Sequence, residues 1–157
     1  MNAKEYLEQV RLLDGRITRK IEEKEYLRNL ATGVGSFGMN PDKVQSSINL
    51  HKTEDAITKY IDLEAEIDRM IDHFVDVRDK IINEIHELND NRYEELLYLK
   101  YIGRQEHDRG KIHYYRLEEI ACTMRKTNGD HYSFDHIAHL HGEALQEFWK
   151  QHSNHKL

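Results

Sequence analysis

The sequence has little that would crosslink the chain or interrupt a helix. It contains one proline and one cysteine in 157 residues. The single cysteine, Cys122, excludes an internal disulfide framework, which fits a reducing compartment. Pro41 lies in the only stretch, residues 32–47, whose three glycines and lone proline break a helical pattern. The rest of the chain is therefore free to form long helices.

Long apolar runs are also missing. No segment approaches the roughly 18–20 consecutive apolar residues of a membrane-spanning helix, and the charged N-terminus does not resemble a secretion signal. We therefore expect a cytoplasmic protein that does not enter a membrane. The hydrophobic share is 38% and the charged share is 33%. That balance is typical of long helices that bury one narrow stripe and expose the rest.

Charge is unevenly distributed along the chain. Residues 1–91 carry 13 Lys and Arg against 19 Asp and Glu, whereas residues 92–157 carry 10 of each and eight of the eleven histidines. The net charge of −6 argues against indiscriminate binding to nucleic acid. The pattern indicates an acidic N-terminal half and a balanced, histidine-rich C-terminal half.

Residues 4–30 carry apolar side chains at steps of three and four, which predicts one apolar face on a long helix. These positions are Tyr6, Val10, Leu13, Ile17, Ile21, Leu27 and Leu30. At 1.5 Å per residue the helix is on the order of 40 Å long, too long for a compact globule to cover. We therefore expect a second long helix to cover it.

Residues 54–88 supply that second helix. An a/d heptad with Arg78 at one seam position runs through Ile67, Ile71, Phe74, Ile81, Ile85 and Leu88. Further apolar positions, among them Ile57 and Ile61, widen the stripe, which favours contact with more than one neighbour. Two interpretations remain open: a helical pair that only buries itself, or a coiled coil that also forms a homodimer.

We therefore predict an all-α protein in two parts. Residues 1–90 form a long antiparallel helical hairpin of coiled-coil type, with a Gly-rich connection near residues 31–52. Residues 91–157 form a smaller helical domain, in which residues 104–115 read as a long loop or a small hairpin. In that domain a short helix over residues 117–124 and a last helix over residues 134–152 are joined by a turn, the pattern of a helix-turn-helix.

The C-terminal residues resemble region four of bacterial sigma factors. The resemblance rests on Glu119-Ile120-Ala121, on Ser133 and Ile137, and on Leu140-His141-Gly142-Glu143-Ala144-Leu145. Over nearly its full length the chain also resembles a family of uncharacterised proteins from phages and integrative elements of Gram-positive bacteria, which is similar to the ArpU-type late-gene transcription regulators. The residues that carry this likeness are the opening 1–7, Val44-Gln45-Ser46-Ser47, Asp62-Leu63-Glu64-Ala65-Glu66-Ile67 and the 140–145 segment.

The resemblance implies a phage- or prophage-derived transcription regulator that binds DNA, RNA polymerase or both. Ser133 is expected to cap the recognition helix, and Asp135, His136 and His139 to face base edges. Phosphate contacts are expected from Arg125, Lys126, Arg116 and Lys111. The chain departs from the pattern in its longer turn, residues 125–132, and in an insertion-like segment at residues 104–116.

One alternative of another class stays open. Base readout most often uses Arg, Lys, Asn or Gln, and this face offers two histidines and an acid. The chain could therefore be a protein-protein interaction module, an inhibitor or adaptor that binds a host protein and has kept the fold without DNA binding.

Catalytic and metal chemistry find little support in the sequence. His136 and His139 share a helical face, but His141 is displaced from them, and no Cys or acidic residue completes a ligand set. No phosphate-binding glycine loop is recognisable, and no catalytic arrangement can be argued around Cys122. We therefore expect no enzyme activity, no metal and no cofactor.

Overall fold

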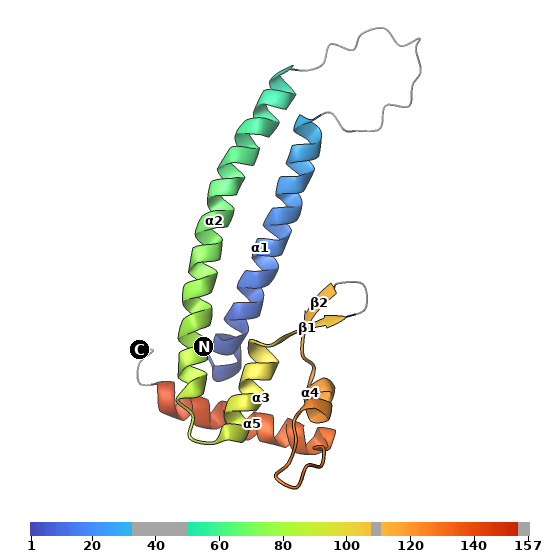
Figure 1. Cartoon of the computed structure of the whole chain (residues 1–157). Helices are drawn as coiled ribbons and strands as arrows, with labels where there is room; N and C mark the ends of the chain where they lie inside the picture. Colours follow the sequence, from blue (N-terminus) through green and yellow to red (C-terminus); the bar gives the residue numbers. More distant parts are fainter. Residues whose placement is uncertain (33–49, 108–110, 154–157) are drawn as a thin grey trace. The chain divides into compact units, whose positions relative to one another are not determined.

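The computed structural model describes residues 1–32, 50–107 and 111–153. Most of these residues are helical, in five helices, with one small two-stranded sheet (Figure 1). The order is α1 (Ala3–Ala31), α2 (Leu50–His86), α3 (Asn91–Tyr101), β1 (Arg104–His107), β2 (Lys111–Tyr114), α4 (Leu117–Thr123) and α5 (Phe134–His152). The predicted all-α class is therefore confirmed. The expected Gly-rich connection lies almost wholly outside the described residues.

Spatial proximity groups the chain into two units. Unit 1 comprises Met1–Leu12 and Val75–Leu157, and unit 2 comprises Leu13–Phe74. The first turns of α1 and the last turns of α2 thus group with the C-terminal helices. The expected division into a helical hairpin over residues 1–90 and a smaller domain over residues 91–157 stays a prediction.

In unit 2 the described parts of α1 and α2 run antiparallel. Lys20 lies 3.5 Å from Glu66 and Lys24 lies 2.6 Å from Glu64, so rising numbers on one helix meet falling numbers on the other. The buried side chains of this unit are Ile17, Ala56, Leu63 and Ile67. Burying these apolar side chains supplies the main favourable free energy of the contact, and the exposed ion pairs add little.

The apolar stripe expected on α1 is only partly buried. Ile17 is 7% exposed, whereas Ile21 and Leu30 are 44% and 51% exposed. At about 100° per residue, Leu30 lies roughly 140° around the helix from Ile17. Each step of three or four residues keeps two neighbouring side chains near one face, but the small angular offsets add up along the helix. The local spacing was correct, but its extension over the whole helix was not.

Along α2 the predicted heptad residues differ in burial. Ile67, Ile81, Ile85 and Leu88 are buried, whereas Ile71 is 40% exposed. The side chain of Arg78 is one-third exposed and lies 3.7 Å from the carboxylate of its neighbour Asp79. It therefore keeps its charge at the surface.

Unit 1 has a core drawn from both ends of the chain. Its fully buried large side chains are Leu7, Val10, Ile81, Ile85, Leu96, Leu97, Tyr101, Ile120, Met124, Ile137 and Phe148. The hydroxyl of Tyr6 donates to the Glu84 carboxylate at 3.2 Å, and its ring lies 6.2 Å from that of Phe148. Burial, together with the Glu84 carboxylate, raises the pKa of Tyr6. α1, α2 and α5 are therefore linked within this unit.

Local signals explain where α3 begins and ends. The side chain of Asp90 accepts from the backbone N–H of Arg92 at 2.9 Å, which caps the helix start. A Cβ at Gly103 would lie 3.0 Å from the carbonyl oxygen of Leu99, so a larger residue would crowd the helix end. The following segment forms the antiparallel pair β1–β2, with Arg104 opposite Tyr114. Residues 104–107 and 111–114 are thus paired as strands, which agrees with the small hairpin among the two interpretations of this segment.

Candidate nucleic-acid interface

The candidate site begins at the N-terminus of α5. The side chain of Ser133 accepts from the backbone N–H of His136 at 3.3 Å, so the predicted cap is present. The buried face of α5 carries Ile137, Leu140, Ala144 and Phe148, as its helical spacing predicts. Periodicity therefore leaves His136 and His139 on the exposed face, beside the positive end of the helix dipole.

The connection between α4 and α5 is a closed turn. The backbone N–H of Lys126 donates to the Asp130 carbonyl, and that of Gly129 donates to the Lys126 carbonyl, both at 2.8 Å. Arg125 and His131 pair as an isolated antiparallel bridge, and the Arg125 guanidinium contacts the His131 ring. Gly129 has φ +86°, a conformation that a side chain disfavours. The turn, which is longer than in the sigma-factor pattern, therefore folds back on itself and leads into Ser133, the N-cap of α5.

Tyr132 joins this turn to the recognition face. It is only 9% exposed. The Lys126 ammonium lies 5.7 Å from the centre of its ring, and the His136 ring meets it edge-on at 5.0 Å. Lys126, predicted to contact phosphate, and His136, predicted to contact a base, therefore both contact the ring of Tyr132.

Sequence reasoning missed Tyr132, although a signal was present. A hydrophobic residue just before an N-cap, followed by another at the fourth helical position, is a recognised helix-start pattern. Tyr132 and Ile137 occupy these two positions around Ser133.

The outer face of α5 also carries an acid-linked network. The Glu143 carboxylate lies 3.2 Å from Nε2 of His139 and accepts from the Tyr93 hydroxyl at 3.4 Å. Tyr93 belongs to α3, so this network ties α3 to α5. It also places a negative charge beside one of the two histidines expected to face bases, which opposes the approach of phosphate.

The remaining predicted phosphate contacts are spread out. Arg116 precedes α4 and Arg125 follows it, so roughly 13 Å of helix axis separates the two. The backbone N–H of Arg116 donates to the Glu119 carboxylate at 2.7 Å, and this bond, with that of His113, lowers the pKa of Glu119. Asp135 is exposed in the first turn of α5. Lys111 lies in β2, but its side chain is outside the described residues.

No family model, curated protein or solved structure matches the chain. Its function must therefore be argued from the described side chains themselves.

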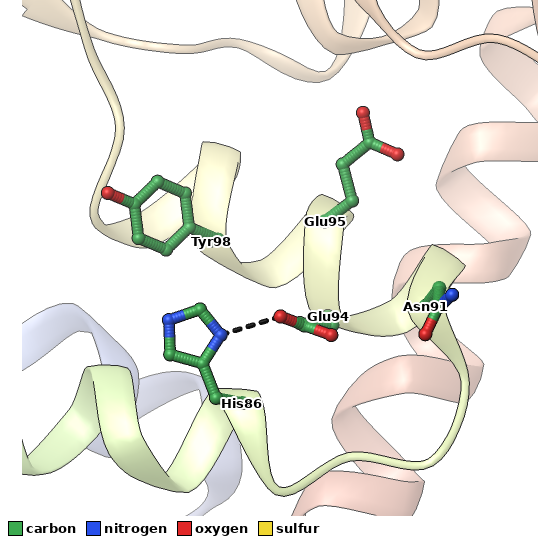
Figure 2. Close-up of a pocket in the computed structure, with 5 residues that line it drawn as sticks. All are labelled: His86, Asn91, Glu94, Glu95 and Tyr98. Atoms are coloured by element: carbon green, nitrogen blue, oxygen red, sulfur yellow. Dashed lines mark hydrogen bonds and ion pairs between the residues drawn. The ribbon is translucent and has the colours of Figure 1, made fainter.

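A pocket lies at the end of α2 and along α3, and the sequence analysis did not predict it. It encloses about 420 Å³ and is lined by His86, Asn91, Glu94, Glu95 and Tyr98 (Figure 2). Nδ1 of His86 lies 2.6 Å from the Glu94 carboxylate, and the His86 and Tyr98 rings stack with centres 6.1 Å apart. Figure 2 shows Glu95 directed away from this pair. The lining offers acceptors and suits a cationic group, but its histidine and one of its two glutamates, Glu94, are already paired with each other.

In residues 1–32, 50–107 and 111–153, no three His, Cys, Asp or Glu side chains gather as metal ligands do. No helix within these same ranges has the length and the apolar character that crossing a membrane requires. Cys122 is exposed on α4 and forms no disulfide.

Proposed function

We propose that the protein is a phage- or prophage-derived transcription regulator that acts in the cytoplasm. In this proposal α4, the closed turn and α5 act as a helix-turn-helix that meets DNA, RNA polymerase or both, and the antiparallel α1 and α2 act as a coiled-coil hairpin. The observation that best supports this proposal is that Lys126 and His136 both contact the ring of Tyr132. A phosphate-binding cation and a base-facing side chain are thereby held side by side at a capped helix N-terminus.

The physical basis is electrostatic positioning. Backbone N–H groups and the dipole at the start of α5 favour an anion, and Lys126 and Arg125 add full positive charges nearby. Such phosphate contacts set the register of a protein on DNA, while side chains at base edges choose the sequence. His136 and His139 are the base-facing side chains in this arrangement, and Glu143 weakens the attraction. We therefore expect modest affinity.

A salt-titrated DNA-binding assay tests the proposal. The probe is the duplex upstream of the protein's own gene, with a shuffled duplex of equal composition as its control. Each phosphate neutralised contributes about −0.9 to the slope of log affinity against log salt, so contacts from Arg116, Arg125 and Lys126 predict a slope of about −3. Absence of saturable binding at low salt would refute DNA binding.

The alternative, a protein-protein interaction module that kept the fold, is favoured by one observation. The Glu143 carboxylate interacts with both His139 and Tyr93. His139, one of the side chains expected to contact bases, therefore already has an intramolecular partner. An acid at that position fits a cationic protein surface better than a phosphate backbone. The same assay separates the two functions, because this module would bind neither duplex at any salt concentration.

We also propose that the chain forms a homodimer through the helical pair. Tyr26 and Leu30, one turn apart on α1, are 63% and 51% exposed and would supply its apolar contact. Doubling the DNA-binding unit in this way would let two weak half-site contacts act together.

A further inference from the structure

An exposed apolar stripe runs along α2 within unit 2. Ile57, Ile61 and Ile71 are 45%, 59% and 40% exposed. At about 100° per residue, these three side chains lie within roughly 80° of one another around the helix. Ile57 and Ile61 lie roughly 80–160° from the buried Leu63 and Ile67, whereas Ile71 lies about 40° from Ile67, at the edge of the buried face. A single exposed isoleucine needs no explanation, but three on one line mark a surface that can be covered.

Acidic side chains accompany this stripe. Asp68 lies on the stripe between Ile61 and Ile71, and Asp72 borders it by the same helical geometry. Residues 53–74 carry seven Asp and Glu against two Lys and Arg. Lys59 lies roughly 120–160° from the three isoleucines around the helix, whereas Arg69 lies only about 80° from Ile61. Acidic side chains therefore outnumber basic ones along the stripe, although Arg69 lies one turn from Asp72 and Lys24 of α1 pairs with Glu64, which lies on the same line.

A second copy of the chain fits this stripe poorly. Pairing two α2 helices in parallel and in register would set Asp68 against Asp68. Like charges placed opposite one another destabilise helix pairing.

We propose that this stripe docks a basic amphipathic helix of another protein. Apolar side chains of the partner would lie between the isoleucines, and Lys or Arg along its edge would meet Asp68 and Asp72. Ile57 and Ile71 are separated by about 21 Å of helix axis, which four turns of a partner helix match. The contact is small and charge-assisted, so it is reversible and weakens with salt. It is a function separate from DNA binding by α5.

The test uses the full-length protein and a fluorescent helical peptide of about 18 residues, with Leu at steps of three and four and Lys along the edges. A matched peptide carries Glu in place of each Lys. We expect the Lys peptide to bind in an anisotropy titration at about 50 mM salt and at least about tenfold more weakly at 500 mM. The Glu peptide is expected not to bind.

Two matched variants localise the contact. Ile61→Glu is expected to weaken the Lys peptide at least about tenfold, whereas Leu12→Glu, at a similarly exposed position on α1, is expected to leave it unchanged. Asp68→Lys is expected to weaken it severalfold and to reduce its salt dependence. Both glutamates replace exposed side chains, and circular dichroism checks that each variant is folded.

Three results would overturn the proposal. The first is no binding of the Lys peptide at low salt, and the second is an equal loss in Ile61→Glu and Leu12→Glu. The third is a dimer of the free protein that Ile61→Glu dissociates, which would assign the stripe to a second copy. Retained DNA binding in Ile61→Glu, measured in parallel, keeps this result distinct from the proposed function of α5.

Discussion

The hydroxyl of Tyr101 and Nε2 of His141 lie 2.9 Å apart and join α3 to α5. Tyr101 is fully buried, and its ring stacks on the imidazole with centres 5.8 Å apart. Burial lowers the pKa of His141 to about 4, and the charges of Lys100 and Lys4 act in the same direction. The imidazole is therefore neutral at neutral pH and is held by a hydrogen bond inside unit 1.

This depressed pKa predicts that stability falls as the medium becomes acidic. In the unfolded chain His141 becomes protonated below about pH 6.5. In the folded chain it stays neutral until about pH 4. The contribution is thus fully present above pH 6.5 and is lost progressively as the pH falls to about 4. The whole shift corresponds to about 3 kcal/mol, and partial exposure of the ring reduces our expectation to about 1–2 kcal/mol.

Urea unfolding at about pH 7, 5.5 and 4.5 measures this loss. His141→Gln keeps a polar side chain without a titrating group, so its free energy of unfolding should fall less over the same range. Carboxylates titrate equally in both proteins and cancel in the comparison. Parallel pH profiles for the two proteins would show that His141 does not contribute.

Ser133→Ala should destabilise the protein by about 1 kcal/mol, because it removes the side chain that caps α5. The measurement is the urea midpoint at constant slope. Thr127→Ala, at an exposed position in the same connection, is the control and should change stability by less than about 0.5 kcal/mol. Equal effects from the two changes would mean that the cap contributes nothing.

Lys126→Ala and His136→Ala should affect DNA binding differently, although both side chains contact Tyr132. Loss of a phosphate contact should weaken all duplexes alike and reduce the salt slope by about one. Loss of a base contact at His136, or at His139, should cost about 1–3 kcal/mol on the preferred duplex and little on the shuffled one. A uniform loss from all three changes would remove the histidines from base readout.

Glu143→Gln should increase DNA affinity severalfold at low salt. The change removes a negative charge beside His139 while keeping a side chain of similar shape. The gain should shrink at high salt, where exposed charges are screened. Asp76→Asn neutralises one exposed acid on α2 and is the control for net charge alone. An equal gain in DNA affinity in both variants would mean that the effect reflects net charge and not the position of Glu143 on α5.

Leu30→Glu should convert the proposed homodimer to a monomer. The exposed leucine lies one turn from Tyr26 on α1, and a charge there would oppose burial in a dimer. Light scattering across micromolar concentrations measures the mass, with Ile61→Glu as the variant expected to remain dimeric. A monomeric mass for the unchanged protein over this range would contradict the dimer itself.

Local patterns predicted much of the secondary structure. The cap at Ser133 and the buried face of α5 involve residues three or four positions apart, so the sequence displays them directly. The apolar spacing of α1 predicted its helix but overstated its buried stripe, because small angular errors add along 29 residues. The β1–β2 hairpin stayed one of two readings, since four-residue strands carry too little pattern.

The sequence by itself determined that this is an all-α chain, where its helices lie and which residue caps α5, because those features depend on neighbours along one helix. Only the tertiary structure decided that Tyr132 supports Lys126 and His136, that Glu143 joins His139 to Tyr93, and that His141 is held beside Tyr101. Those contacts involve another helix or the turn, and for Tyr93 and Tyr101 they span 40 or more residues. Helical periodicity does not encode which surfaces meet; burial of apolar area across the whole chain does.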